Sequence, residues 1–329
     1  TLVEPGVLPP VFHRAEPSLL QHVPGAVRHY QKLIPAMPLS WALRRSLADL
    51  DVVISSSHAC AKRVNLAPGV AHVCYCHTPM RYAWEFALER NRFPRGLQAL
   101  ASVAMRGFRR WDRGTGARVD RFVANSRDVA QRIRRAYGRE STVVHPPVDT
   151  AFFTPGGTRG DHFLYLGRLV GYKRPHLVVE AFQGLPHRLI VAGSGPMRAR
   201  LEATAPANVA FAGRVGDDEL RDLLRSARAL IFPAHEDFGI VMAEALACGT
   251  PVIALAAGGA LDIVTPGENG WLIDGQRIGA LRHAIREASR MDPATADISL
   301  GAQRFGRERY RMEMDRVVRE TLAEPGRRW

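Results

Sequence analysis

The chain has 329 residues, of which 46% are hydrophobic and 23% are charged, a composition typical of folded globular proteins. Its length suits two domains of roughly 150 residues each better than a single core. The sequence holds no run of about 18 consecutive apolar residues, so it predicts no membrane-spanning helix. The formal charge of +13 lies mainly in residues 1–150, which carry 22 Lys and Arg against 11 Asp and Glu.

The four cysteines form no C-x-x-C pair, and their spacing is typical of single buried thiols. We therefore expect neither a zinc site nor a disulfide framework. The sequence shows no signal-peptide pattern, and a cytoplasmic location is expected.

Short apolar runs rich in Val, Ile and Phe alternate with helical patterns along nearly the whole chain, which indicates βαβ units. The pattern predicts two doubly wound parallel α/β sheets, one in each half. Expected strands in the first half are residues 51–57, 71–77, 121–126 and 141–148, and in the second half residues 162–169, 187–193, 208–213, 228–234 and 250–256.

The domain boundary is predicted near Pro155, because prolines and glycines interrupt the pattern in VHPPVDTAFFTPGGTRGDHF. The predicted domains are residues 1–154 and 155–305, and a charged helical tail at 306–329 is expected to pack back toward the first domain. The segment TLVEPGVLPPVF opens the chain without a preceding strand and glycine turn. We therefore expect the first βα unit of the first domain to be missing from this sequence.

In the first half, His77 ends the apolar run AHVCYCH. An isolated histidine at the end of a strand is more often a packed or surface residue than a catalytic one. His77 nevertheless follows the carboxyl end of a parallel strand, where open α/β sheets bind ligands, so it is a candidate site residue.

The most basic segment contains eleven arginines from Arg106 to Arg139. Residues 97–113 place arginines on one helical face and, on another, Leu97, Leu100, Ala104, Phe108 and Trp111. This pattern predicts reversible attachment to an anionic membrane surface, and an ordinary domain helix with a solvated basic face explains it equally well. Nucleic-acid binding also fits the charge, but the sequence carries no recognition motif for it.

In the second half, Arg168 and Lys173 follow the expected strand HFLYLG, just before a helical pattern begins. Two cations on a turn at the carboxyl end of a parallel strand suit a diphosphate. The alternative is a pair of surface cations with no ligand.

The segment HEDFGIVMAEALACGTPVIA, residues 235–254, places Glu236 and Glu244 eight residues apart. Phe238 and Gly239 lead into a helix expected to begin near Ile240, and a helix N-terminus presents unpaired N–H groups and partial positive charge to an anion. Glu244, one turn into that helix, suits two sugar hydroxyls, while Glu236 would meet the other end of the ligand. Taken alone, Glu236 is equally consistent with a solvated loop residue. Glu244 alone is equally consistent with an ordinary first-turn glutamate that the helix dipole favours.

Gly193 and Gly195 lie in VAGSGPMRARL, but Arg198 stands where a dinucleotide fingerprint has its third glycine. We interpret the two glycines as a tight turn beside the ligand. His235 and Glu236 are not followed by a second histidine four residues on, so neither a metal nor another cofactor is expected.

The segments GRLVGYK, GSGP and FPAHEDFGIVMAEALACGTPVIA make the chain resemble the retaining nucleotide-sugar glycosyltransferases of family 4. The E-x7-E spacing is the hallmark of that family, and the likeness covers almost the whole chain. It implies the GT-B fold, in which two Rossmann-like domains face a central cleft. CYCHTPMRYAW, RFVANSRDVAQRI, VVHPPVD and GGALDIV further resemble bacterial members that use GDP-mannose and build polysaccharides or lipid-linked glycans.

The resemblance implies a role for each matching position in the donor-binding domain. Arg168 and Lys173 match the cations that neutralise the donor diphosphate, and Glu244 matches the carboxylate that binds the ribose. Glu236 matches the glutamate that contacts the hydroxyls of the transferred sugar. The matching backbone positions are Val215, which often meets the base, and the turn Phe238, Gly239 and Ile240, which approaches sugar and phosphate.

The resemblance also implies that His77 lies near the transferred sugar. Two departures from the family pattern stand out. Asp262 occupies the position of a glutamate in the usual G-G-A-L-E segment, and a shorter carboxylate there is expected to alter sugar contacts or to be neutral. The first strand of the family and its Gly-Gly loop do not precede Thr1.

The resemblance predicts transfer of a hexose, with mannose from GDP-mannose favoured, to a hydroxyl of a glycan or lipid-linked acceptor. Retention at the anomeric carbon is expected, and the leaving diphosphate itself helps to deprotonate the acceptor. The expected location is cytoplasmic, with attachment to the inner membrane face. Three alternatives stay open: a non-catalytic binding protein, a GT-B-like sugar-nucleotide epimerase, and a nucleic-acid-binding protein.

Overall fold

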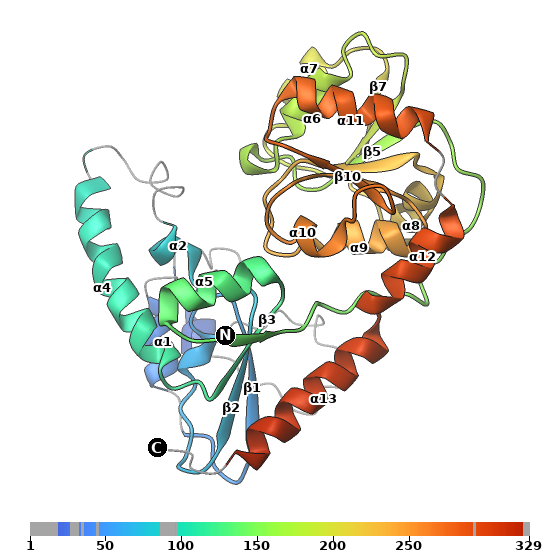
Figure 1. Ribbon diagram of the computed structural model, residues 1–329. Helices are drawn as coiled ribbons and strands as arrows, with labels where there is room; N and C mark the ends of the chain where they lie inside the picture. The colour runs from blue at the N-terminus through green and yellow to red at the C-terminus, as the bar shows by residue number, and fades with distance from the viewer. Residues whose placement is uncertain are drawn as a thin grey trace. The chain divides into compact units, whose positions relative to one another are not determined.

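The computed structural model describes residues 19–26, 33, 36–43, 46–85, 96, 98–291 and 294–324. The chain divides into two compact units (Figure 1). The first comprises Thr1–Asn125, Val129–Val143 and Met314–Trp329, and the second comprises Ser126–Asp128 and Val144–Glu313.

The sheet of the first unit has four parallel strands in the order β1-β2-β3-β4. They are β1 (Val52–Ser57), β2 (Ala71–Cys76), β3 (Arg121–Ala124) and β4 (Ser141–Val143). Every residue of β2 is buried, as expected of a central strand in a parallel sheet. The described helices are α1 (Met37–Ala42), α2 (Arg81–Trp84), α4 (Gln98–Gly116) and α5 (Arg127–Tyr137), with short 3₁₀ turns η1 (Leu19–His22) and η3 (Ala61–Arg63).

The core of the first unit lies between its sheet and α5. Val129 and Ile133 of the helix pack with Cys74 and Phe122 of the strands. Phe122 also stacks on Tyr137 at the end of α5, with ring centroids 5.3 Å apart. The four cysteines are free and buried, as predicted from their spacing.

The sheet of the second unit has six parallel strands in the order β10-β9-β8-β5-β6-β7. They are β5 (Phe163–Leu166), β6 (Leu189–Ala192), β7 (Val209–Gly213), β8 (Ala229–Phe232), β9 (Val252–Leu255) and β10 (Gly270–Ile273). The helices are α6 (Pro175–Ala181), α7 (Arg198–Thr204), α8 (Asp217–Ser226), α9 (Ile240–Ala247), α10 (Ala260–Ile263), α11 (Ile278–Arg290) and α12 (Thr295–Ala302), with 3₁₀ turns η6 (Gly171–Lys173) and η7 (Gln303–Phe305).

Alternating strand residues supply two separate cores in the second unit. Leu164 and Leu230 face one core, which contains residues of α8, α9 and α12, while Phe163 and Ile231 face the other, which contains residues of α6 and α11. Helices therefore cover both faces of the sheet (Figure 1). The two parallel α/β sheets predicted from the sequence are confirmed.

The last helix, α13 (Arg307–Ala323), carries the predicted charged tail. Its residues from Met314 onward cluster with the first unit. Val317 and Thr321 are buried, and Glu324 just beyond the helix forms an ion pair with Arg121 of β3. The chain passes from the first unit to the second at Val143 and Val144, and the predicted boundary near Pro155 stays a prediction.

Candidate functional site

The predicted site lies where the strand order of the second unit reverses direction. From β5 the chain proceeds outward through β6 and β7, and then returns to place β8 on the other side of β5. The loop after β5 carries Arg168 and Lys173, and the loop after β8 carries Glu236. Because open parallel sheets bind ligands outside the strand ends at such a switch point, the sheet order brings two separately predicted clusters to one location.

Lys173 and Glu236 form an ion pair across this switch point. The Lys173 Nζ atom lies 3.2 Å from Glu236 Oε1, and each side chain is 21% exposed. Burial, together with the nearby Glu236 carboxylate, raises the pKa of the Tyr165 hydroxyl beneath the loop. Arg168 is exposed, and no hydrogen bond or ion pair of its side chain is found within the described residues. The site therefore holds one paired and one solvated cation.

The glycine turn after β6 supports the loop of Arg168. A Cβ atom on Gly193, whose φ is +130°, would lie 2.0 Å from the carbonyl oxygen of Gly167. A Cβ atom on Gly195 would lie 2.5 Å from the carbonyl oxygen of Leu169. Glycine is thus required at both positions because two backbone segments touch there. Both glycines thus lie where the backbone is closely packed, and their place beside a ligand stays a prediction.

The loop after β8 turns into α9 at Gly239, whose φ of +82° places the residue in the left-handed region. The helix begins at Ile240, as predicted, and Ile240 is exposed while Phe238 is buried beneath the turn. The N-terminus of α9 thus carries its first N–H groups at the same strand ends as Lys173. This arrangement is suited to a negatively charged ligand.

Gly258 and Gly259 pack against the backbone of the loop after β8, a contact that was not predicted from the sequence. Gly259 N donates a hydrogen bond of 3.0 Å to the Glu236 carbonyl oxygen. A Cβ atom on Gly258 would lie 2.3 Å from that same oxygen, and one on Gly259 would lie 2.3 Å from Phe238 Cα. The adjacent glycines in GGALD were the available signal, because close backbone approach excludes larger residues.

Glu244 lies one turn into α9 and lines a hollow of about 410 Å³. Burial and the carboxylate of Asp217, at the start of α8, raise the pKa of Glu244 to about 7. No hydrogen bond or ion pair of the Glu244 side chain occurs among the described residues. Val215 lies two residues before Asp217 and packs partly buried against the core. The hollow is lined by Glu244 and Asp217 together with Pro147, Asp149, Phe152, Phe153, Leu220 and Arg307.

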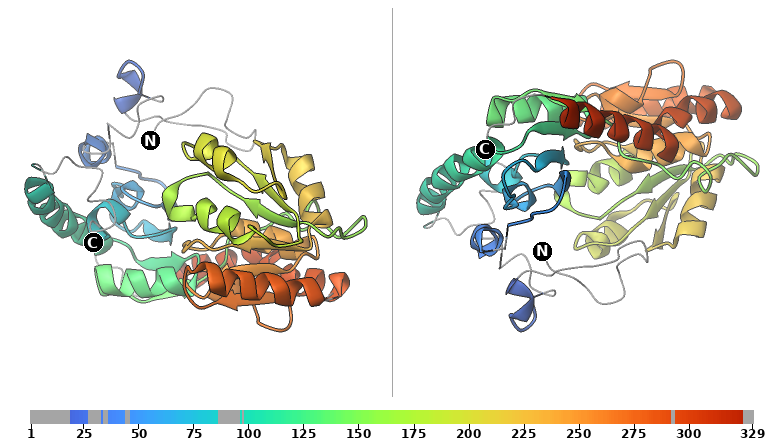
Figure 2. Two further views of the ribbon diagram at one scale, coloured as in Figure 1. Left: turned by 90° about the horizontal axis from the view of Figure 1, so that it is seen from above. Right: turned by 90° about the horizontal axis from the view of Figure 1, so that it is seen from below.

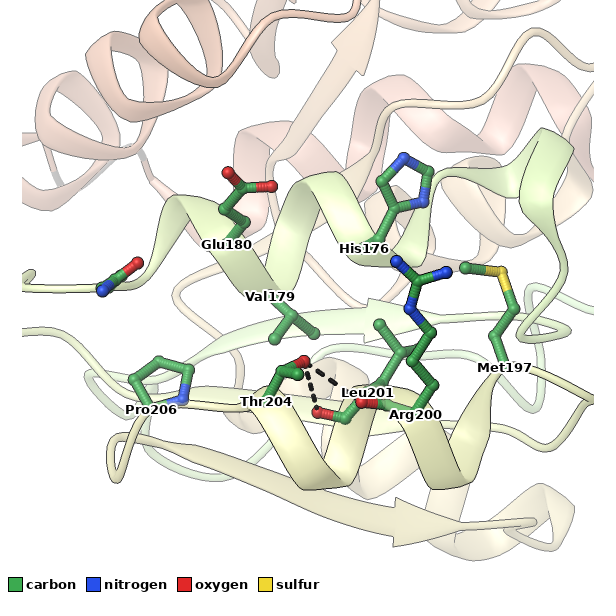
Figure 3. A pocket seen from close by; sticks show the side chains of 9 residues that line it. His176, Val179, Glu180, Met197, Arg200, Leu201, Thr204 and Pro206 are labelled. Carbon is green, nitrogen blue, oxygen red and sulfur yellow. Dashed lines mark hydrogen bonds between the residues drawn. The ribbon is translucent and has the colours of Figure 1, made fainter.

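A larger hollow, of about 450 Å³, lies between α6 and α7 and contains none of the predicted site residues. Val179 and Leu201 form its apolar floor, while His176 and Arg200 lie together at one end (Figure 3). Burial and the neighbouring arginines lower the pKa of His176. Volume alone does not make this hollow the site, because the strand-end glycines, the helix N-terminus and the ion pair all lie elsewhere.

His77 lies directly after β2 in the first unit. Its Nε2 atom is 2.8 Å from Ser56 Oγ, and its backbone oxygen accepts a hydrogen bond of 3.1 Å from the Asn125 side chain. The ring also contacts Tyr75 edge-on, with centroids 5.2 Å apart. His77 and the donor-site candidates belong to different compact units, so its proximity to the transferred sugar stays a prediction.

Asp262 is buried and engaged in protein contacts. Its Oδ2 accepts a hydrogen bond of 2.7 Å from the backbone N–H of Arg127, and its Oδ1 pairs with the Arg127 guanidinium. Arg304 donates to the Asp262 carbonyl oxygen at 3.3 Å. All three residues cluster with the second unit. The position that departs from the family pattern thus anchors a backbone segment through its carboxylate.

The predicted apolar face of the basic helix α4 is divided between packed and exposed residues. Phe108 and Trp111 pack against a buried cluster that contains Cys60 and Met80, whereas Leu100 is 68% exposed and Leu97 lies outside the described residues. The second half of the predicted apolar face is therefore used for packing, Leu100 in the first half is exposed, and membrane attachment stays a prediction. Val103, 59% exposed, lies beside Leu100 on the outer face with Arg106 and Arg110. The helix stands at the margin of the first unit (Figure 2).

The described residues form neither a membrane-spanning helix nor a metal cluster. Within 19–26, 33, 36–43, 46–85, 96, 98–291 and 294–324, no helix combines the length and apolar character needed to cross a bilayer. In the same part of the chain, no three His, Cys, Asp or Glu side chains gather as a metal site.

The fold and the site define a two-domain α/β protein with an anion-binding arrangement at a sheet switch point. Residues 3–152 match the family model "Glycosyltransferase Family 4", and residues 156–305 match "Glycosyl transferases group 1". Between them the two models cover nearly the whole chain. The chain belongs to the glycosyltransferases that combine these two domains, so the predicted family is confirmed.

Individual relatives agree with this assignment. The D-inositol 3-phosphate glycosyltransferase of Mycobacterium tuberculosis is 33% identical over 199 residues, which cover 53% of this chain and 42% of that protein. Among solved structures, sucrose-phosphate synthase from Thermosynechococcus elongatus has a TM-score of 0.67 at 21% identity, over 92% of this chain and 80% of that one. Anabaena Alr3699/HepE in complex with UDP and glucose has a TM-score of 0.56 at 20% identity, over 75% and 77%. These structures share the GT-B fold with the chain.

Proposed function

We propose that the protein transfers a hexose from a nucleoside-diphosphate sugar to a hydroxyl of a glycan or lipid-linked acceptor, with retention at the anomeric carbon. The observation that carries the proposal is the Lys173–Glu236 pair, placed at the switch point of the second sheet and beside the N-terminus of α9. A cation and a helix N-terminus at one sheet edge suit the diphosphate. Glu236 suits the hydroxyls of the sugar.

In the reaction, the bond between the anomeric carbon and the diphosphate oxygen breaks while the acceptor oxygen bonds to that carbon on the same face. The acceptor proton passes to the departing diphosphate. Lys173, Arg168 and the start of α9 stabilise the negative charge that grows on the diphosphate, which is where preorganised electrostatics contribute most. Glu244 and the Val215 backbone hold the ribose and base, and His77 is proposed to contact the transferred sugar.

GDP-mannose is the favoured donor, on the likeness of several segments to GDP-mannose-dependent enzymes. The Anabaena neighbour was solved with UDP and glucose, so a UDP-sugar is the competing donor to test. A panel of GDP-mannose, UDP-glucose and UDP-N-acetylglucosamine separates the two. Analysis of the products distinguishes a transferase from an epimerase, which releases UDP without using an acceptor.

The phosphate site is tested by Lys173→Ala. Loss of one preorganised cation is expected to lower turnover by about 10²–10³-fold with the preferred donor. Arg188→Ala is the matched control, because Arg188 is an exposed cation at the amino end of β6, the opposite edge of the sheet. Unchanged turnover of every donor by Lys173→Ala would contradict this assignment.

Attachment to an anionic membrane surface is proposed through the outer face of α4. Leu100 and Val103 stay exposed there beside arginines, a combination suited to anionic headgroups. Vesicles with and without phosphatidylglycerol test it by flotation, with Val103→Ser expected to weaken binding. Leu300→Ser, at a 73% exposed position of the second unit, is the control, and equal flotation of all three proteins would remove the proposal.

A further inference from the structure

The Lys173–Glu236 pair leaves each partner with unused binding capacity. Lys173 has three N–H donors, and its Nζ also lies 6.0 Å from the centre of the Tyr172 ring. Glu236 Oε1 lies within 3.2 Å of Lys173 Nζ but has no well-aligned hydrogen bond among the described residues. Each side chain as a whole is 21% exposed, although Glu236 Oε1 itself is buried, so a ligand reaches the pair from the Lys173 side and from the rest of the Glu236 side chain. Lys173 and Glu236 thus neutralise each other, and a ligand can replace Glu236 as the partner of Lys173.

We infer that Glu236 is a specificity-determining residue that distinguishes the sugar nucleotide from the nucleoside diphosphate left after transfer. The inference rests on the proposed function and concerns the same site. In the absence of ligand, the Glu236 carboxylate takes the place of a phosphate oxygen on Lys173. A diphosphate bound to Lys173 therefore brings new negative charge close to a carboxylate that has lost its share of the cation.

The repulsion between the diphosphate and the Glu236 carboxylate is offset only while the sugar is attached to the diphosphate. While the sugar is attached, its hydroxyls donate hydrogen bonds to Glu236, and these charge-assisted bonds compensate the carboxylate. Once the glycosylated acceptor has left, the sugar hydroxyls are gone, and Lys173 is the neighbouring cation that the described residues offer to Glu236. The carboxylate then competes with the diphosphate for the ammonium group, which favours release of the product.

The backbone keeps Glu236 in position for this competition. The Glu236 carbonyl oxygen is held by Gly259 N at 3.0 Å, and the close approach of Gly258 leaves no room for a side chain beneath the loop. Lys173 lies on the η6 turn, and its carbonyl oxygen accepts a hydrogen bond of 3.4 Å from the buried Tyr165 hydroxyl. Because both loops are tied to the sheet, the carboxylate remains near the cation when a ligand binds.

Equilibrium binding of GDP, UDP and their sugar nucleotides, measured by calorimetry at constant ionic strength, tests the inference. Glu236→Gln removes the charge and keeps the size, and it is expected to tighten binding of the free nucleoside diphosphate about fivefold without tightening the sugar nucleotide. In the Lys173→Ala background only the direct repulsion between carboxylate and diphosphate is left, so the same substitution is expected to have a smaller effect. Glu244→Gln is the matched control, because the ribose is common to both ligands and both should weaken by the same factor.

Distinct outcomes overturn distinct claims. If Glu236→Gln tightens both ligands equally, weakens the diphosphate, or acts equally without Lys173, the inference is wrong while the proposed donor site stands. If the wild-type chain binds no nucleoside diphosphate or sugar nucleotide, the proposed function fails and the inference fails with it. Thermal unfolding of each variant establishes that the binding changes are measured on folded protein.

Discussion

Each unit contains a lysine–carboxylate ion pair, and the two pairs differ in burial and in hydrogen bonding. In the first unit, Lys62 and Asp112 are 2% and 0% exposed, with 2.5 Å between Nζ and Oδ1. The other carboxylate oxygen of Asp112 accepts hydrogen bonds from Trp84 Nε1 at 2.7 Å and from the Tyr137 hydroxyl at 2.8 Å. Lys62 also donates to the Ala59 carbonyl oxygen at 2.7 Å. Both oxygens of the Asp112 carboxylate are thus hydrogen-bonded, and the pair is sealed from water.

The pair in the second unit is open by comparison. Lys173 and Glu236 are 3.2 Å apart, each keeps about a fifth of its surface exposed, and neither is saturated with hydrogen bonds. A fully buried pair holds the packed elements together, since removing one partner leaves the other charge buried and uncompensated. A partly solvated pair at a strand end can exchange its partner for a ligand. The difference separates a structural charge from a functional one.

The largest expected effect is obtained by breaking the sealed pair. Asp112→Ala leaves the Lys62 ammonium, the Trp84 N–H and the Tyr137 hydroxyl without their acceptor, and it should lower the free energy of unfolding by about 3–5 kcal/mol. Denaturant titration followed by circular dichroism measures this. Asp218→Ala is the control, because its carboxylate is 82% exposed in its pair with Arg221 and should contribute about 0–1 kcal/mol. A loss below 1 kcal/mol for Asp112→Ala would contradict the structural role.

The strand pattern was predictable from the sequence because buried parallel strands are short apolar runs. All nine predicted strands are present, but the run at 141–148 shortens to β4 at Ser141–Val143, since the two prolines that follow have no N–H for the ladder. The tenth strand, Gly270–Ile273, was missed because four residues between turn-forming segments give little pattern. Local sequence thus established the elements and left their exact ends uncertain.

The site was only half predictable, for a reason of topology. Arg168, Lys173, Glu236 and Glu244 were each identifiable as residues near strand ends, but no local pattern states that β8 lies beside β5. The ion pair between Lys173 and Glu236 depends on that neighbourhood. The buried Lys62–Asp112 pair was likewise missed, since its partners are 50 residues apart and carry no motif.

Glu244 is a carboxyl group without a paired cation among the described residues, and it is expected to have an intermediate effect on the free energy of unfolding. The pKa of Glu244 is raised from 4.5 to about 7 by burial and by Asp217. Because the folded state holds this proton more tightly than the unfolded chain, the group favours folding fully below pH 4.5, and the contribution is lost as the pH rises through 7. From pH 5 to pH 8 the loss should be about 1–3 kcal/mol.

The test compares the pH dependence of unfolding in wild type and in Glu244→Gln, which cannot ionise. The variant should lose less stability than wild type between pH 5 and pH 8, and the difference isolates this one carboxyl. Glu268→Gln, at an exposed position in the turn before β10, should leave the wild-type dependence unchanged. Identical pH profiles for wild type and Glu244→Gln would show that the hollow leaves the carboxyl fully hydrated.

The smallest stability effect is expected where the open pair is broken. Glu236→Gln should change the free energy of unfolding by only about 0–1 kcal/mol, because the lost attraction is screened by water and the remaining ammonium can be solvated. Arg309→Ala, which breaks the surface pair with Glu313, provides the scale for such a change in the same denaturant titration. A loss near that of Asp112→Ala would mean that Glu236 is held for folding, and the contrast between the two pairs would disappear. A small change in stability together with a change in ligand selectivity would mean that Glu236 is held for ligand binding. A charge that folding does not require can exchange its ion-pair partner for a ligand.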